Sequence, residues 1–581
     1  MENKVVYNYL KTYAKKYDCD FFSNPPINGE RVEYVLLHQN QGVCLVEVID
    51  SKNLTKIIKD IPLKLQNLKN HKKNISELYL ARSMKSINEK QIFKYLLCFP
   101  NVNTYDLSEV TEYINKLKYS YVSVAGEDTI YFNRSPIKLN QDHRKKNSLD
   151  VLLDKDELDD LHNWCTEYEY LKEQGETLEL SETQSEIISR DLKREKILGP
   201  AGSGKSVVLV GKARKAVEKN QRVLFLVYNK TLPAYIRSLC TRKPFSFNPN
   251  LIKTNHFHAW LGELDDKYGE GDIYSLTRRC NEKEKKNDHF FDIEVVDKTK
   301  DLLLRNKVTK YDLILVDELN DMHHHWMSVF TMMLKAEGKL IVAGDDTQNI
   351  YSRSIQDMSK TLDDLGFKER QSSQELRESY RLPDDMIKFL QEFLNVFPVD
   401  NSSYPVVPAQ TSLLPSDSHT NKKWVDLRSL DNSDNVSNAE VCADEIVNLL
   451  KEDKKNSVSD LTFISSNKKM LSNVVKILEN KKYKVQDTLK DVSKRSFKKE
   501  SEAIKCTTIQ SYKGFEGRLI VIYLKGNIDN NDHELLKLLY VALSRVKKNE
   551  MGSYITLITD ISYRSKTSLE KLNKLKYSFN K

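Results

Sequence analysis

One short segment of the 581-residue chain, GPAGSGKS at residues 199–206, has residue types and spacing suited to holding the phosphates of a nucleotide. It satisfies the pattern G-x-x-x-x-G-K-[ST] between an apolar segment and a helical one, which is the context that this pattern requires. Glycines allow backbone N–H groups to approach the phosphates, and the N-terminus of the following helix adds positive potential. We therefore predict a phosphate site in which Lys205 reaches the β- and γ-phosphates and Ser206 holds Mg²⁺. The loop that would cradle the phosphates contains Gly199, Gly202 and Gly204.

A second segment, YDLILVDE at residues 311–318, supplies the carboxylates that such a site needs. It predicts a buried strand with two acids at its carboxyl end, where Asp317 is suited to the metal and Glu318 to orienting or deprotonating the water. Hydrolysis at P-loop sites is slow without a cation on the γ-phosphate. Arg381 in ESYRLP and Arg545 in LYVALSRVKK are the candidates. Both follow the first predicted sheet, so we expect them to reach across a cleft that ATP binding closes.

The segments around these motifs predict parallel α/β sheets. From Lys196 onward, short apolar segments alternate with helical ones, and each apolar segment ends in a loop of polar or glycine residues. This pattern is typical of parallel sheets covered on both faces, which bind ligands at the carboxyl ends of their strands. We predict two RecA-like domains of this class, at residues 178–380 and 381–581, with a long surface connection at 401–438 inside the second.

The residues before this part predict a smaller α/β domain at 1–132. Its expected strands are Val32–Leu37, Gly42–Val48 and Tyr119–Val124, and its expected helix is Leu63–Leu80. A polar and basic stretch and then an acidic helical stretch follow, so residues 133–177 are predicted to form a linker and a helical segment.

The composition fits a cytoplasmic protein with a polyanionic partner. The formal net charge is +8, and lysines cluster at 481–499 and in the tail at 564–581, which favours a partner with a phosphate backbone. A solvated lysine-rich surface explains the same composition equally well. The eight cysteines are scattered without zinc-ligand spacing, as is typical of reduced thiols. No apolar run approaches the roughly 20 residues of a membrane span, so no membrane association is expected.

The order of motifs from about residue 178 to 557 resembles the superfamily 1 helicases of the UvrD/Rep type. The resemblance covers about two thirds of the chain and implies an ATP- and Mg²⁺-dependent motor on DNA that has a single-stranded portion. It implies that Gln184 reads adenine, Tyr380 stacks on it, Glu516 contacts the nucleotide sugar and Gln348 senses the γ-phosphate. It also assigns Arg381 to the γ-phosphate and Arg545 to the role of arginine finger. The residues that it places near DNA are Tyr228, Asn229, Phe257, His258, Trp260 and Tyr351.

Aromatic side chains among basic groups suit base stacking along a strand. For each aromatic residue taken singly, core packing is an equally good explanation, above all for Phe257 and Trp260. The chain departs from the family where DELND replaces the usual D-E-A-Q-D and where Gln510 replaces a histidine. The segments between motifs are short, so we expect a compact motor with reduced accessory subdomains.

The N-terminal residues resemble a nuclease-related domain of the PD-(D/E)xK kind. This resemblance implies that Glu33 and Glu47 bind Mg²⁺. The family has a lysine two residues after the second acid, where this chain has Ile49, and Lys52 is the nearest replacement. Three alternatives stay open for this domain: an active nuclease, a degenerate module that binds DNA, a protein partner or another copy, and a mistaken alignment.

The expected function is therefore that of a DNA helicase or translocase with an attached nuclease-like domain, acting in DNA processing. Defence against phage or plasmid DNA is a family-level analogy. The alternative is a nucleotide-switched DNA-binding sensor or scaffold whose N-terminal domain does not cut.

Overall fold

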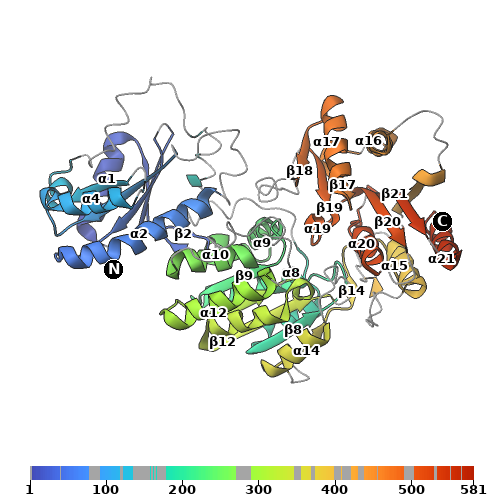
Figure 1. The fold of residues 1–581 in the computed structure, drawn as a ribbon, viewed down its shortest axis with the longest axis horizontal. Coiled ribbons are helices and arrows are strands. Elements are labelled where there is room, and N and C mark those ends of the chain that lie inside the picture. The colour runs from blue at the N-terminus through green and yellow to red at the C-terminus, as the bar shows by residue number, and fades with distance from the viewer. Residues whose placement is uncertain are drawn as a thin grey trace.

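In a computed structural model, the described residues form three α/β domains in succession along the chain, each with a sheet of five or six described strands (Figure 1). The structure describes residues 3–76, 92–134 and 178–580 with internal gaps, together with isolated positions between 153 and 165. The gaps are 40, 118, 120–121, 270–289, 346–354, 368–372, 398–406, 409–419, 430–436, 454–455, 490–502, 529–532, 550 and 564–565. The α/β class with parallel sheets that the sequence predicts is confirmed. Within the described part, none of the helices has both the length and the apolar character needed to cross a bilayer.

The N-terminal domain contains a sheet in the order β1-β4-β5-β6-β7. β1 and β4 are antiparallel to their neighbours, whereas β5, β6 and β7 are parallel to one another. Helix α1 covers one face, and helices α2 and α4 cover the other. Every residue of β5 is buried because both faces of the sheet are covered. The elements are α1 (Lys4–Tyr17), β1 (Asp20–Ser23), β4 (Tyr34–His38), β5 (Gly42–Val48), α2 (Leu54–Ile75), β6 (Phe93–Phe99), α4 (Ser108–Lys116), β7 (Val122–Gly126) and α5 (Glu127–Tyr131).

Helix α2 begins nine residues before the predicted start at Leu63. The side chain of Asn53 caps it by accepting a hydrogen bond from the Lys56 N–H at 3.2 Å, and Pro62 lies within the helix. Pro is usually placed near a helix start because it lacks an N–H. Here the buried side chains of Ile57, Ile61, Leu65 and Leu68 pack against the sheet on both sides of Pro62 in the sequence, so the helix continues past the proline.

The first parallel domain contains a six-stranded sheet in the order β10-β9-β11-β12-β8-β13, with every pair parallel. Its core lies on both faces of the sheet, as expected for this class. The strands are β8 (Arg194–Leu198), β9 (Val223–Val227), β10 (Lys253–His256), β11 (Tyr311–Val316), β12 (Leu334–Gly344) and β13 (Ser373–Glu375). The helices are α7 (Glu182–Ser189), α8 (Lys205–Glu218), α9 (Leu232–Thr241), α10 (Phe257–Tyr268), α12 (Val295–Arg305), α13 (Met327–Met332) and α14 (Ile355–Asp364).

The second parallel domain has a six-stranded sheet in the order β16-β21-β20-β17-β19-β18, again wholly parallel. The strands are β16 (Thr420–Asp426), β17 (Leu461–Ser465), β18 (Val485–Asp487), β19 (Ile504–Thr508), β20 (Leu519–Ile528) and β21 (Ser553–Tyr563). The helices are α15 (Asp384–Val396), α16 (Asn438–Glu452), α17 (Lys468–Asn480), α19 (Ile509–Tyr512), α20 (His533–Leu543) and α21 (Lys566–Phe579). A short parallel pair, β14 (Glu378–Ser379) with β15 (Val407–Pro408), lies apart from this sheet.

Strand β16 corrects the prediction of a surface connection over 401–438. It pairs with β21 along seven residues and forms the edge of the sheet. The indole of Trp424 is buried and donates a hydrogen bond to the Thr559 hydroxyl at 3.0 Å. The surrounding Ser, Asn and Pro residues concealed this short strand in the sequence, because they carry the composition of a loop.

Candidate nucleotide site and N-terminal acidic site

The phosphate loop connects β8 to α8 in the first parallel domain. Gly202 and Gly204 have φ angles of 78° and 84°, a region that favours glycine. A Cβ on Gly204 would lie 2.3 Å from Nε2 of Gln184, and a Cβ on Gly202 would lie 2.4 Å from Cβ of Arg381. The ammonium of Lys205 donates to the carbonyls of Gly199 at 2.8 Å and Pro200 at 3.0 Å, so it already lies over the loop.

The predicted metal ligands lie together at the carboxyl end of β11. The hydroxyl of Ser206 donates to Oδ2 of Asp317 at 2.6 Å. Burial, reinforced by the charge of Glu318, raises the pKa of Asp317 to about 6. A bound cation stabilises the charged form of such a buried carboxylate, so Ser206 and Asp317 are suited to hold Mg²⁺.

Glu318 is placed for action on a water molecule. Its φ is 54°, and its Oε2 is buried without a hydrogen-bond partner in the described part of the chain. Burial alone would raise the pKa of this carboxyl, but the charges of Lys513 and then Lys205 lower it below the usual value. The carboxylate is therefore ionised at neutral pH and can accept a proton.

The nucleotide pocket is a cavity of about 210 Å³ lined by both parallel domains. The segment before β13 contributes Gln184, Gly202, Gly204, Lys205, Ser206 and Glu318, and the segment after β13 contributes Tyr380, Arg381, Glu516 and Arg545. The structure therefore brings together most of the residues predicted for the nucleotide. Gln348 lies outside the described residues.

Gln184 holds the phosphate loop from the side of α7. It forms a capping box with Ser181 at the start of α7, and its Nε2 donates to the carbonyl of Ser203 at 3.0 Å. Tyr380 contacts the same loop through its backbone N–H, which donates to the carbonyl of Gly202 at 3.0 Å. These contacts place both residues at the phosphate loop, and their assignment to the adenine stays a prediction.

The two arginines differ in how they are held. Arg381 donates from Nε to Glu516 at 2.6 Å, and this carboxylate outweighs burial and raises the pKa of the guanidinium. Arg545 is 1% exposed, and its Nε and one terminal nitrogen donate to the Val541 carbonyl and the Ser544 hydroxyl, both at 2.8 Å. Burial and the nearby Arg381 lower the pKa of Arg545 to about 10. Two cations confined in one cavity favour a polyanionic ligand between them.

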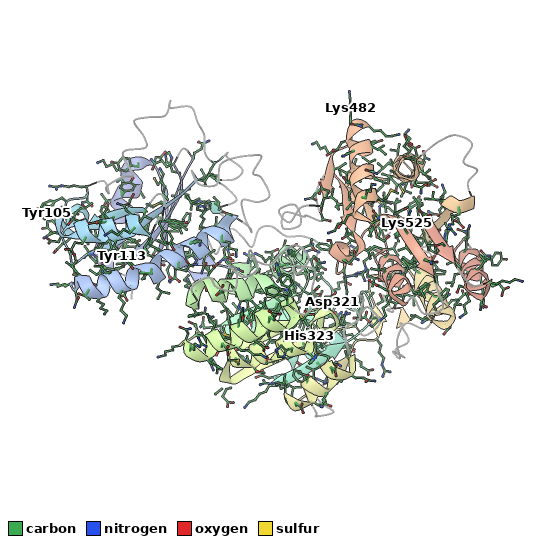
Figure 2. All side chains as sticks on the ribbon, viewed as in Figure 1. Tyr105, Tyr113, Asp321, His323, Lys482 and Lys525 are labelled. Atoms are coloured by element: carbon green, nitrogen blue, oxygen red, sulfur yellow. The ribbon has the colours of Figure 1, made fainter. Side chains whose placement is uncertain are left out.

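The parallel domains meet through a buried ion pair that the sequence did not reveal. The ammonium of Lys513 contacts both carboxylate oxygens of Asp321, at 2.7 and 2.8 Å, and Oε2 of Glu318 at 3.6 Å. Figure 2 labels Asp321 on the side of the first domain that faces the second. Both Asp321 and Lys513 side chains are 2% exposed. The charge in DELND was visible in the sequence, but its partner lies 192 residues away.

Asn229 is a second contact between the parallel domains. Its amide donates to the carbonyls of Gln510 at 2.8 Å and Ser511 at 3.1 Å. In this conformation the side chain of Asn229 joins the two domains, and its assignment to DNA stays a prediction.

The aromatic residues predicted to stack on DNA are mostly part of the core. Phe257 and Trp260 are 0% and 1% exposed, so the assignment of these side chains to base stacking is wrong for this conformation. Phe257 stacks on Trp326 at 4.2 Å between ring centroids, and Tyr228 stacks on the same indole at 5.9 Å. His258 packs edge-on against it at 4.9 Å. Tyr351 lies outside the described residues.

In the N-terminal domain, Glu33 and Glu47 do lie close together, and a lysine from α2 lies between them. The ammonium of Lys64 contacts Oε1 of Glu33 at 2.9 Å and Oε2 of Glu47 at 2.5 Å. Glu33 also accepts a hydrogen bond from the Val48 N–H at 2.6 Å. Lys52 is exposed, and no contact in the described residues joins it to either acid. The lysine beside the two acids is therefore Lys64, not Lys52, and Ile49 is 3% exposed.

The place between the two carboxylates is taken by the ammonium of Lys64. Burial raises the pKa of Glu47 to about 7, against the lowering effect of Lys64 and with a further increase from Glu33. Among the described residues, no group of three or more His, Cys, Asp or Glu side chains is placed to hold a metal. Mg²⁺ between Glu33 and Glu47 would require Lys64 to move away, so the predicted metal site does not fit the residues as they lie.

Sequence reasoning missed Lys64 because the family pattern places its lysine on the strand. The available signal was weak: Lys64 lies beside Leu65 on the buried stripe of α2, where a charged side chain needs a partner.

Comparison with known proteins shows a similarity in the middle of the chain. A family model described as an AAA domain matches residues 184–354, from Gln184 past both phosphate-site segments. This match supports assigning residues 184–354 to the P-loop helicase superfamily and indicates nucleotide hydrolysis. A search of curated protein sequences gave no match.

Proposed function

We propose that this chain is an ATP- and Mg²⁺-dependent DNA translocase or helicase with an attached nuclease-like domain. The observation that carries the proposal is the nucleotide pocket shared by the two parallel domains. Lys205 and Glu318 come from one domain, and Arg381 and Arg545 come from the segment that follows it. A ligand bound to both sides stabilises the closed arrangement, and its loss favours opening.

The chemistry follows from the positions of these side chains. Lys205 and Arg381 bind the triphosphate, and Arg545 meets charge that develops on the γ-phosphate. Glu318 orients the attacking water and accepts its proton. Mg²⁺, held by Ser206 and Asp317, would offset phosphate charge. The ion pair of Lys513 with Asp321 and Glu318 connects this chemistry to the contact between the domains.

DNA-stimulated ATP hydrolysis tests the motor. The wild-type chain should hydrolyse ATP faster when single-stranded DNA is added, and Lys205→Ala should abolish the hydrolysis. Absence of stimulation by every single- and double-stranded DNA tried would contradict the proposal. A role in defence against foreign DNA rests on family analogy alone, and a plaque assay with the Lys205→Ala variant would test it.

A second candidate is a nucleotide-switched DNA-binding sensor whose N-terminal domain does not cut. The bridge of Lys64 between Glu33 and Glu47 favours it, because the ammonium lies where a metal would have to bind. A DNA cleavage assay with Mg²⁺ distinguishes the two functions. Cleavage that is lost in Glu47→Ala would remove the sensor, whereas no cleavage with normal ATP hydrolysis would favour it.

A further inference from the structure

The N-terminal domain is joined to the first parallel domain by a tight hairpin. Strands β2 (Pro26–Ile27) and β3 (Glu30–Arg31) are connected by Asn28 and Gly29, whose φ angles are 48° and 76°. The Gly29 N–H donates to the Asn250 carbonyl at 2.6 Å, and Oδ1 of Asn28 accepts from the Thr254 N–H at 2.9 Å. A Cβ on Gly29 would lie 2.3 Å from the backbone nitrogen of Lys253. The two domains therefore meet at a close, specific contact.

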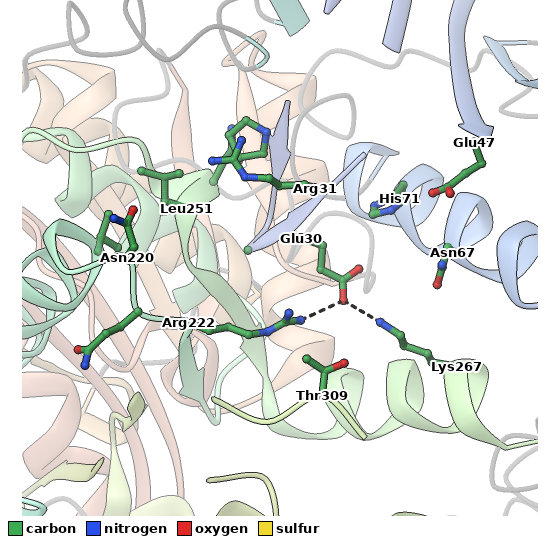
Figure 3. Close-up of a pocket in the computed structure, with 15 residues that line it drawn as sticks. Glu30, Arg31, Glu47, Asn67, His71, Asn220, Arg222, Leu251, Lys267 and Thr309 are labelled. Atoms are coloured by element: carbon green, nitrogen blue, oxygen red, sulfur yellow. Dashed lines mark hydrogen bonds and ion pairs between the residues drawn. The ribbon is translucent and has the colours of Figure 1, made fainter. Parts of the chain in front are cut away.

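Beside this contact lies a cleft of about 740 Å³ with one wall from each domain (Figure 3). Glu47 lines its N-terminal side, so the cleft leads directly to the acid pair bridged by Lys64. On the opposite wall, Arg222, Asn250 and Thr309 precede strands β9, β10 and β11. They lie at the amino ends of parallel strands, whereas the nucleotide pocket lies at the carboxyl ends. The cleft is thus separate from the nucleotide pocket.

The charged groups of the cleft come from both walls. Figure 3 shows Glu30 facing Lys267 and Arg222, whose nitrogens lie 3.5 and 4.0 Å from its Oε1. Arg31 is exposed at the hairpin. The lining residues therefore include three basic side chains and two carboxylates, in which Glu30 is paired with Lys267 and Arg222 and Glu47 is paired with Lys64 from outside the lining. The balance favours an anionic ligand.

The uncharged lining narrows the class of anion. The amides of Asn67, Asn220 and Gln221 line the cleft, and His71 is 3% exposed with an Nδ1 that has no hydrogen-bond partner among the described residues. The lining residues that the structure describes include no Phe, Tyr or Trp, so no aromatic side chain among them can stack on a base. Amides and guanidinium groups suit the phosphates and sugars of a strand, which they bind without reading its sequence.

We propose that this cleft binds the phosphodiester backbone of a single DNA strand and that the first parallel domain thereby completes the groove of the nuclease-like domain. The inference rests on the proposed function for the identity of the ligand. The strand passes Arg31 and Gln221 and reaches the side of the cleft that Glu47 lines. Whether or not the cluster cuts, the N-terminal domain depends on its neighbour for this binding surface.

Two measurements on the full chain test the cleft. The first is the affinity for a fluorescent single strand without ATP, as a function of salt. Arg31→Glu should weaken binding roughly threefold to tenfold and reduce the salt slope by about one, as expected for one lost phosphate contact. The matched control is Lys116→Glu, because the Lys116 side chain is 70% exposed on α4 and does not line the cleft. It should bind like the wild type.

The second measurement is photo-crosslinking from a benzophenone amino acid at Gln221, with the same group at Lys116 as the control. We expect a crosslink to single-stranded DNA from Gln221 only. Equal affinities for the two charge-reversed variants together with no crosslink from Gln221 would overturn the proposal, as would a crosslink only to duplex DNA or only to RNA. DNA-stimulated ATP hydrolysis of the wild type is measured in parallel. Its loss contradicts the proposed function, whereas its presence without a crosslink contradicts the cleft alone.

Discussion

Replacing Lys513 by Met should weaken the contact between the two parallel domains far more than it weakens either domain. Lys513 lies 2.7 Å from Asp321, and the two side chains are each 2% exposed. Removing one member of a buried ion pair costs about 3–5 kcal/mol because the other charge stays buried without a partner. Asp321 and Lys513 belong to different domains, so opening the domains returns Asp321 to water and avoids most of that cost. The substitution therefore shifts the equilibrium toward the open arrangement.

The expected shift is large. A loss of about 3 kcal/mol changes the ratio of closed to open molecules by roughly a hundredfold, since each 1.4 kcal/mol is a factor of ten. Lys513 also helps to lower the pKa of Glu318, so its loss raises that pKa and leaves less of the carboxylate ionised. Both effects reduce hydrolysis. The assay is kcat/KM for ATP with saturating DNA, which should fall by at least tenfold.

Two further variants make the test specific. Lys525→Met is the matched control, because Lys525 forms an exposed ion pair with Asp560 inside one domain at 2.8 Å. Such pairs contribute about 0–1 kcal/mol, so this variant should keep its activity. In the double variant Lys513→Met with Asp321→Asn, the unpaired charge is gone, and activity should recover in part. If Lys513→Met kept the kcat/KM of the wild type, the buried pair would not hold the domains together.

Three other predictions concern single contacts. Gly204→Ala should weaken binding of a fluorescent ATP analogue at least tenfold, because its Cβ meets Gln184, whereas Gly366→Ala, with a φ of 93° and no contact closer than 3.8 Å, should bind normally. The raised pKa of Glu47 means that ionisation of this carboxyl opposes folding. Hydrogen-exchange protection of β5 should therefore fall as the pH rises from about 4.5 to 7. The Glu47→Gln variant should lose this pH dependence. Protection that rises over this range would refute the environment described for Glu47. Asn28→Ala should speed proteolysis between the N-terminal and first parallel domains, because Asn28 is 1% exposed and bonded across the contact, and an unchanged cleavage rate would contradict that contact.

The sequence was most informative where short-range chemistry determines position. GPAGSGKS and YDLILVDE each predict a strand followed by a loop of fixed composition, so the amino-acid sequence alone predicts that Lys205, Ser206 and Asp317 lie together. The contacts of Lys64 and Lys513 could not be predicted in this way. Each depends on which helix or domain packs against a distant strand, and that choice is made by the whole core rather than by the residues nearby.

The aromatic residues are a second case in which the sequence did not determine where side chains lie. Phe257 and Trp260 occur in a segment that suits stacking on DNA, yet the free energy of burying large apolar side chains places them against Trp326 and Phe330. Residue type alone did not distinguish the two outcomes. Burial in the structure did.

The central claim, that residues of both parallel domains form one site for ATP hydrolysis, is tested most directly by Arg545→Ala. The measurement is the rate of DNA-stimulated ATP hydrolysis at saturating ATP, with ATP affinity determined separately on the same variant and Arg545→Lys as a folding control. Because Arg545 lies beyond the matched AAA domain but lines the nucleotide pocket, hydrolysis should fall about a thousandfold while ATP still binds. Hydrolysis at the wild-type rate would show that the first parallel domain acts alone and would contradict the account.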